Sequence, residues 1–124
     1  IMLLNDFFTI NTLETSDAEV KAELVIHAGH RIFEGHFPGQ PVVPGVCMMQ
    51  MVKELLEQVL EKETMLSTAA EMKFLAVIDP TKNNSISAHI KYSQEEGGQV
   101  KVMASLFKEV LVHFKFKGVF LINS

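Results

Sequence analysis

The sequence contains a single cysteine, four prolines and no cluster of basic residues among its 124 residues. Because Cys47 cannot form a disulfide within the chain, we expect a reducing compartment, the cytoplasm. The formal net charge of −4 argues against nucleic acid and anionic membranes as partners. No apolar run is long enough to insert into a membrane, and the short apolar stretch 1–4 follows no basic residue and predicts no signal peptide.

The chain has the length of one ordinary domain, so we treat residues 1–124 as a single unit. Hydrophobic residues make up 48% of the sequence, which is enough to build a core without disulfides or a structural metal. The sequence contains no internal repeat, low-complexity segment or linker.

Alternation of apolar and polar residues predicts most of the secondary structure. It predicts strands at Val20–Ala28, Ser85–Tyr92, Val100–Phe107 and Val110–Lys117, less regular strands at Phe7–Thr15 and Met65–Ile78, and a last strand at Val119–Ile122 after an interruption at Gly118. Glu96–Gln99 contains two glycines and is a hairpin signal. The same alternation places His89 and His113 at outward-facing positions.

Residues from Gly45 to about Lys62 follow helical spacing instead. The first two turns are apolar nearly all round, so we expect that end of the helix to be buried. A helix can bury its whole circumference only if a sheet wraps it, which predicts an α+β fold with a curved antiparallel sheet around one helix. Six polar residues form a narrow stripe, which we expect to be half solvated in the last turns: Gln50, Lys53, Glu54, Glu57, Gln58 and Glu61.

The loop before this helix contains three of the four prolines, Pro38, Pro41 and Pro44. Proline fixes φ and removes a backbone donor, so we expect the loop to be extended and rigid. His36 stands at the head of the loop. A loop histidine commonly caps or packs, but a rigidly held imidazole is a natural general base near neutral pH, and the prolines favour that interpretation.

Two residues of the helix are candidates for the same site. Gly45 lies where free backbone N–H groups point outward and stabilise a negatively charged oxygen; alternatively, it only relieves a tight corner. Gln50 either begins the solvated face or lines a cavity at the buried end of the helix. Its amide can orient a water or a hydroxyl but cannot act as an acid.

The segment His36–Val46 reads His-Phe-Pro-Gly-Gln-Pro-Val-Val-Pro-Gly-Val. It resembles the signature of the 3-hydroxyacyl-[acyl-carrier-protein] dehydratases of fatty acid synthesis. Lys73–Pro80 also resembles that family's strand leading into a proline-containing turn, and the order of elements fits over most of the chain. These dehydratases have the hot-dog fold, a long helix wrapped in an antiparallel sheet, so the resemblance implies the same architecture.

The resemblance also implies roles for three residues. His36 matches the histidine that removes the α-proton of a 3-hydroxyacyl thioester, and Gly45 matches the glycine whose amide binds the thioester carbonyl oxygen. The family's acid, which protonates the departing hydroxyl, falls at Gln50. General acid–base assistance contributes on the order of 10²–10⁴-fold, so this departure matters. Glu54 lies one turn later, about 6 Å along the helix axis, which is too far for one rotamer change to replace the acid.

Several functions therefore remain open. The chain could be a dehydratase, which would be slow if water or His36 carries the proton. It could be a subunit that works with an acid-bearing relative. It could also bind or hydrolyse acyl thioesters in the same pocket. Family sites are built across a dimer, so the resemblance implies a homodimer, a higher oligomer such as a hexamer, or a heterodimer. It implies an acyl-carrier-protein or coenzyme A thioester as partner and no cofactor.

The resemblance places five further residues beside the substrate: Phe37, Pro44, Val46, Met49 and Phe74. The helix methionines suit an adaptable acyl tunnel but are equally ordinary core residues: Met48, Met49 and Met51. Four basic residues are candidates for contacting an acidic carrier protein: Arg31, Lys73, Lys115 and Lys117. We expect no metal site, because His27, His30 and His36 have no fixed ligand spacing. Cys47 is expected to be a small buried hydrophobe.

Overall fold

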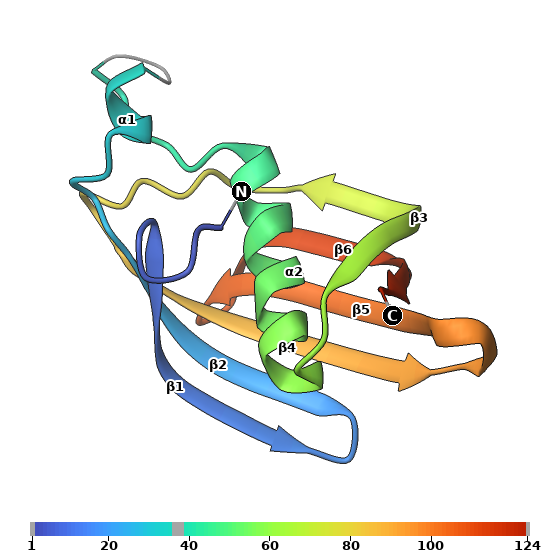
Figure 1. The fold of residues 1–124 in the computed structure, drawn as a ribbon. Coiled ribbons are helices and arrows are strands. Elements are labelled where there is room, and N and C mark those ends of the chain that lie inside the picture. Colours follow the sequence, from blue (N-terminus) through green and yellow to red (C-terminus); the bar gives the residue numbers. More distant parts are fainter. Residues whose placement is uncertain (1, 36–38, 124) are drawn as a thin grey trace.

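The computed structural model describes residues 2–35 and 39–123. Its strands are β1 (Phe8–Ser16), β2 (Glu19–Ile26), β3 (Thr64–Phe74), β4 (Ser85–Gln94), β5 (Gln99–Lys108) and β6 (Leu111–Ile122), and its helices are α1 (Ile32–Gly35), α2 (Gly45–Leu60) and the short 3₁₀ turn η1 (Glu96–Gly98). The strands form one antiparallel sheet in the order β1-β2-β4-β5-β6-β3. The sheet curves around α2, which lies along its concave face (Figure 1). The α+β prediction is confirmed, and the arrangement is the hot-dog fold.

The core lies between α2 and the inner face of the sheet. Alternate residues of three strands are buried there, as their period of two predicts: Val20, Ala22, Leu24, Ile26, Ile86, Ala88, Ile90, Val100, Val102, Ala104 and Leu106. The helix contributes Met48, Met51, Val52, Leu55 and Leu56. Each large side chain of this kind stabilises the fold by about 1.5–3 kcal/mol when fully buried. No helix within 2–35 or 39–123 is long and apolar enough to cross a bilayer.

The turn between β4 and β5 has the geometry that its sequence predicts. Gly97 and Gly98 adopt φ angles of 74° and 75°, a region that costs other residues energy but not glycine. The backbone N–H of Glu95 donates to the carbonyl of Gln99 at 2.7 Å and closes the hairpin. The predicted hairpin is therefore confirmed.

Strand β3 ends at Phe74, so the predicted end at Ile78 was wrong. The segment 75–80 leaves the strand and runs beside the loop that precedes α2. There the N–H of Val43 donates to the carbonyl of Ile78 at 2.9 Å, while Leu75 donates to His113 on β6 at 2.9 Å. The apolar residues of this segment therefore join the loop to the sheet instead of extending the strand.

Strand β6 runs unbroken through Gly118, so the predicted interruption at that glycine was wrong. The buried glycine has a steric reason instead. A Cβ at this position would collide with the carbonyl oxygen of Thr68 and the ring of Phe116. Register shifts in β3 lie on either side of its pairing with Gly118, so the missing side chain lets the two strands approach closely.

His113 is only 4% exposed, so the prediction that it faces outward was wrong. A register irregularity between β5 and β6, at Leu106/Phe107, breaks the strict alternation just opposite this residue. Its Nδ1 lies 3.1 Å from the carbonyl oxygen of Ala76, which accepts the hydrogen bond. Its Nε2 is buried with no hydrogen-bond partner in the part of the chain that the structure describes.

Candidate functional site

The start of α2 presents backbone donors that no other described residue accepts. Pro44 precedes the helix in an extended conformation and offers no side-chain cap. Its carbonyl accepts the N–H groups of Cys47 and Met48 at 3.0 and 3.2 Å. The N–H groups of Gly45 and Val46 have no hydrogen-bond partner among residues 2–35 and 39–123. Such donors at a helix start favour an oxygen that gains negative charge.

Phe74 lies directly over Gly45. A Cβ at Gly45 would lie 2.9 Å from Cε1 of the Phe74 ring, so the ring occupies the space that any other residue would need. The ring also stacks on Phe114, with centroids 5.0 Å apart. The fold thus brings together two predicted site residues, Gly45 from the helix and Phe74 from the end of β3.

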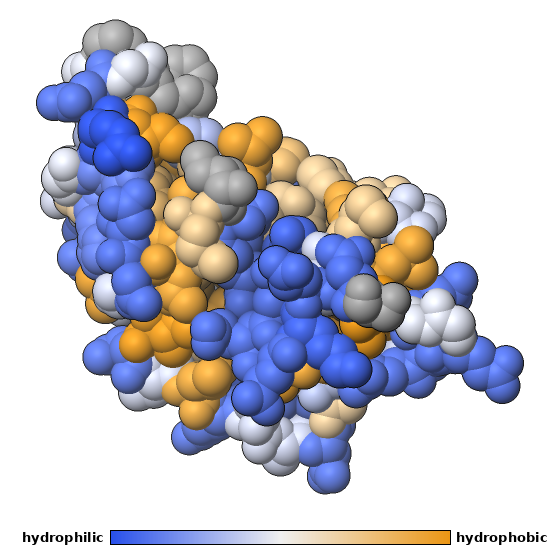
Figure 2. Space-filling model, in the orientation of Figure 1, coloured by the Kyte–Doolittle hydropathy of each residue, from blue (hydrophilic) through white to orange (hydrophobic). Residues whose placement is uncertain are grey.

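A hollow of about 410 Å³ opens beside this contact. We call it the helix-start hollow; its lining is Val42, Val43, Gly45, Met48, Phe74, Leu75, Ala76 and Val77. Three of its side chains are at least half exposed: Phe74, Leu75 and Val77. Figure 2 shows hydrophobic side chains gathered beside the start of α2 and a hydrophilic band over the helix itself. An apolar space next to free amide donors suits an acyl group with a polarised carbonyl.

The other predicted substrate-binding residues have different surroundings. Pro44 is buried and Val46 is 78% exposed, both next to Gly45. Met49 is half-buried against the core, whereas its neighbour Met48 lines the helix-start hollow. The helical spacing of the methionines did not distinguish these two positions.

His36 and Phe37 lie outside the described residues, as does Pro38. The described part of the loop resumes at Gly39, with φ of 81°. From there it reaches Val43, whose hydrogen bond to Ile78 fixes the chain just before the helix. The described end of the loop is therefore fixed to segment 75–80, and the rigid placement of His36 stays a prediction.

Gln50 and Glu54 form a pair on α2. The Nε2 of Gln50 donates to Oε2 of Glu54 at 2.8 Å. Glu54 is 2% exposed. It is therefore buried, although its helical spacing placed it in the polar stripe that we expected to be half solvated. Gly45 and Gln50 are five residues apart, which separates them by roughly 140° around the helix and about 7.5 Å along it. Within one chain, they therefore face different directions.

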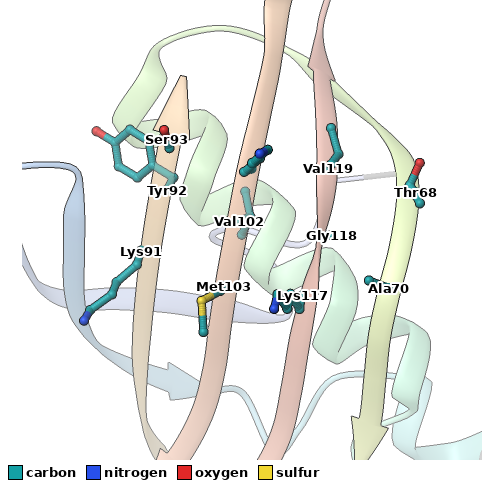
Figure 3. A pocket seen from close by; sticks show the side chains of 11 residues that line it. Thr68, Ala70, Lys91, Tyr92, Ser93, Val102, Met103, Lys117, Gly118 and Val119 are labelled. Atoms are coloured by element: carbon teal, nitrogen blue, oxygen red, sulfur yellow. The ribbon is translucent and has the colours of Figure 1, made fainter. Parts of the chain in front are cut away.

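A second hollow, of about 450 Å³, lies on the outer face of the sheet. We call it the outer-face hollow. Lys91, Met103 and Lys117 lie side by side across β4, β5 and β6 at one end of it, with α2 on the other side of the sheet (Figure 3). Of the predicted carrier-protein contacts, Lys115 and Lys117 are on this outer face, and Lys73 pairs with Glu71 at 3.2 Å. The sheet separates this hollow from the helix start.

A third hollow, of about 710 Å³, extends from the loop residues Gly39 and Gln40 to His113. The carboxylate of Asp79 lies at its edge and accepts hydrogen bonds from the backbone N–H and the hydroxyl of Thr81 at 2.9 and 2.6 Å. These bonds, chiefly that from the hydroxyl, lower the pKa of Asp79. The carboxylate therefore shapes the turn after segment 75–80.

The remaining histidine and cysteine candidates have structural partners. His30 Nε2 contacts the carboxylate of Asp6 at 3.0 Å, and His27 Nδ1 contacts the carbonyl of Asp6 at 2.7 Å. The hydrogen bond from His30 is the largest cause that lowers the pKa of Asp6. Cys47 is buried, and burial raises the pKa of its thiol. No group of three potential ligands for a metal ion is found in the described ranges.

The sheet wrapped around one helix, with an apolar hollow beside free amides at the helix start, defines the class: a hot-dog-fold protein. The sequence model of the ApeI-like family, described as ApeI dehydratase, matches residues 12–110. The chain therefore belongs to the ApeI-like dehydratase family.

Two curated relatives of this chain are dehydratases. The chain is 29% identical over 91 residues to the 3-hydroxyacyl-[acyl-carrier-protein] dehydratase FabZ of Blochmanniella pennsylvanica, covering 73% of this chain and 56% of the relative. It is 28% identical over 92 residues to FabZ of Rickettsia rickettsii, covering 68% and 63%. The chain thus spans little more than half the length of these relatives.

The fold is similar to a chain of the dehydratase heterocomplex ApeI:P from Xenorhabdus doucetiae, with a TM-score of 0.66, 20% identity, and coverage of 90% and 96% of the two chains. It is also similar to the uncharacterized protein PH1136 from Pyrococcus horikoshii, with a TM-score of 0.68, 14% identity, and coverage of 96% and 85%. At these identities, the likeness establishes the fold alone.

Proposed function

We propose that this protein dehydrates 3-hydroxyacyl thioesters to trans-2-enoyl thioesters, with His36 as the base and Gly45 as the oxyanion donor. The observation that carries the proposal is the start of α2. There the N–H of Gly45, which has no hydrogen-bond partner in the described part of the chain, lies at an apolar hollow with Phe74 in its wall. The loop signature and the FabZ relatives support the same reaction. By the same analogy, we propose an acyl-carrier-protein or coenzyme A thioester as substrate, and the cytoplasm as location.

The reaction requires a base and a place for the developing charge. His36 takes the proton from C2, the electron pair of that bond forms the C2=C3 double bond, and the C3–O bond breaks. The departing hydroxyl leaves as water once it gains a proton. Because Gln50 cannot supply that proton, we assign its return to protonated His36 itself. The N–H of Gly45 stabilises the enolate-like thioester oxygen between these steps.

We propose that the working unit is a dimer in which Gln50 of one chain faces Gly45 of the other. The two residues face different directions on the helix of one chain. Strand β3 is an edge strand, and most of its residues are exposed. The apolar side chains of Phe74, Leu75 and Val77 continue from its end. An exposed strand edge next to an apolar patch is a surface that a second chain would cover.

The test is the hydration of crotonyl and longer enoyl thioesters of an acyl carrier protein, with the molar mass measured by light scattering. We expect turnover by a dimer and its loss in His36→Ala. No turnover, together with no change in His36→Ala, would contradict the proposal. A parallel assay for released thiol identifies a thioesterase, because hydration releases none.

Gln50 favours a second candidate, a subunit that works beside an acid-bearing relative. The amide at the acid position is the observation for it, and the ApeI:P complex is described as a heterocomplex. This candidate predicts thioester binding without turnover by the chain alone. Activity would then appear only when a relative with a carboxylate at the corresponding position is added.

A further inference from the structure

Glu54 is a buried carboxylate in the middle of α2, with 2% of its surface exposed. A buried charge is costly unless hydrogen bonds replace its water. Here three donors do so. The backbone N–H of Leu3 and the Nε2 of Gln50 donate to Oε2 at 2.7 and 2.8 Å, and the N–H of Leu4 donates to Oε1 at 2.7 Å.

Two of these donors belong to a segment far from the helix in sequence. Leu3 is buried against the core, and its carbonyl accepts the N–H of Phe7 at 2.7 Å in a tight turn. This turn fixes the two backbone N–H groups that hold Glu54. The carboxylate is therefore held by the backbone of another part of the fold, and its position does not depend on flexible side chains.

The fixed carboxylate sets the orientation of the Gln50 amide. A carboxylate only accepts hydrogen bonds, so the atom of Gln50 that faces it must be Nε2 and not Oε1. The amide oxygen of Gln50 is consequently directed away from Glu54. If the two groups were reversed, two sets of acceptor oxygens would face each other at 2.8 Å.

We propose that Glu54 is a positioning residue of the site: it holds Gln50 so that its amide oxygen accepts the hydrogen bond of the substrate's 3-hydroxyl. This inference rests on the proposed function and extends it. Glu54 does not touch the substrate in this role, and its two oxygens already accept three hydrogen bonds. A hydroxyl that donates to Gln50 turns its own lone pairs toward the histidine that returns the proton.

The same contact predicts the effect of restoring the family's acid. Gln50→Glu alone would place a second carboxylate 2.8 Å from that of Glu54, where the Gln50 amide now lies. Two negative charges so close oppose each other's ionisation. The exchange Gln50→Glu/Glu54→Gln keeps one carboxylate and one amide. We therefore expect the exchange variant to hydrate crotonyl carrier-protein thioester at least about tenfold faster than Gln50→Glu, within the range general acid assistance spans. Equal rates, or a faster single variant, would overturn the proposal.

Glu54→Gln alone tests the orientation. The new amide can donate to Oε1 of Gln50, at the loss of the acceptor for the Leu3 N–H, and this turns the Gln50 N–H groups toward the substrate. We expect kcat to fall at least about tenfold with KM within about twofold, as when an interaction of the transition state is lost. The matched control is Glu57→Gln, one turn later on the same stripe. Glu57 accepts the backbone N–H and hydroxyl of Thr64 at 2.6 and 3.2 Å.

Glu57 is partly buried and also pairs with Lys53 at 3.3 Å, so Glu57→Gln removes a hydrogen-bonded carboxylate from the same helix without touching Gln50. We expect it to lower Tm but to keep kcat within about twofold of the unsubstituted protein. If Glu54→Gln keeps its kcat, or loses no more than Glu57→Gln at an equal loss of Tm, Glu54 has only a structural role and the proposal is wrong.

A measurement on the unsubstituted protein separates this inference from the proposed function and needs no folded variant of Glu54. In ¹H–¹⁵N spectra, the side-chain amide of Gln50 is assigned by its loss in Gln50→Ala. We expect the proton that it donates to Glu54 to be shifted downfield and slow to exchange. Two rapidly exchanging protons with the shifts of an exposed amide would overturn the inference. Absent turnover with a downfield amide proton would instead refute only the dehydratase assignment.

Discussion

The helix-start hollow and the outer-face hollow have similar volumes, about 410 and 450 Å³, but different surroundings. The first lies where the N–H groups of Gly45 and Val46 have no hydrogen-bond partner among the described residues, and where any side chain larger than that of glycine would have to displace an aromatic ring. The second lies on paired strands whose backbone groups bond to one another. A hollow becomes a candidate site through the donors that converge on it, and its volume alone decides nothing.

The largest effect is expected from Gly45→Ala. The new Cβ would push against the Phe74 ring and displace the amide that we assign to the thioester oxygen. Loss of one oxyanion donor costs on the order of 10²–10³ in kcat, so we expect a loss of that size in thioester hydration. Gly29→Ala is the control, because nothing lies within 4 Å of a Cβ there. Equal activity of the two variants would place the oxyanion donor elsewhere.

Phe74→Ala is expected to have the next largest effect. The ring forms one wall of the helix-start hollow and stacks on Phe114; such a stacked pair contributes about 0.5–1.5 kcal/mol beyond its burial. We expect a lower Tm and a rise in KM that grows with acyl chain length, to about tenfold for long chains, since each buried CH₂ contributes about 0.8 kcal/mol. A KM series from four to ten carbons measures this. A rise independent of chain length would remove Phe74 from the acyl-binding wall.

The sequence predicted the architecture better than it predicted the polar contacts. The period of two along Val20–Ile26 and the glycines at Gly97 and Gly98 are local signals, and both appear in the structure as predicted. The burial of Glu54 depends on Leu3 and Leu4, which lie some fifty positions away in the sequence. Helical periodicity cannot predict a contact between segments so far apart. Helical spacing therefore assigned Glu54 to the half-solvated stripe, although its bonds hold it in the interior.

His113 illustrates the same limit on the sheet. Strict alternation places it outward, but one irregular step in the pairing of β5 and β6 breaks that alternation. Only the resemblance pointed to Gly45 and Phe74 together. It named both as site residues but did not predict that the ring of Phe74 lies over the backbone of Gly45. Local patterns predict elements, whereas the site depends on which elements the fold brings together.

The reactivity of the Cys47 thiol measures how readily the buried side of the start of α2 opens to solvent. A helix start lowers the pKa of a thiol, but burial acts in the opposite direction here, and the pKa of Cys47 is raised. At pH 8, the folded protein therefore holds this thiol more protonated than the unfolded chain does. Because the thiolate is the reactive form and the thiol itself is buried, we expect iodoacetamide to react more slowly with native than with denatured protein. Equal rates would show that the helix start opens readily to solvent.

The smallest effect is expected at the outer-face hollow. Met103 lines this hollow and is 56% exposed, and Met103→Thr keeps a residue that suits a strand. Surface substitutions of this kind usually change stability by no more than about 0.5 kcal/mol, so we expect an almost unchanged Tm and kcat/KM within about twofold. The substitution should also leave the chain-length dependence of KM unchanged, in contrast to Phe74→Ala. A loss that grows with acyl length would mean that the acyl group reaches the outer face of the sheet, and would reverse the assignment of the two hollows.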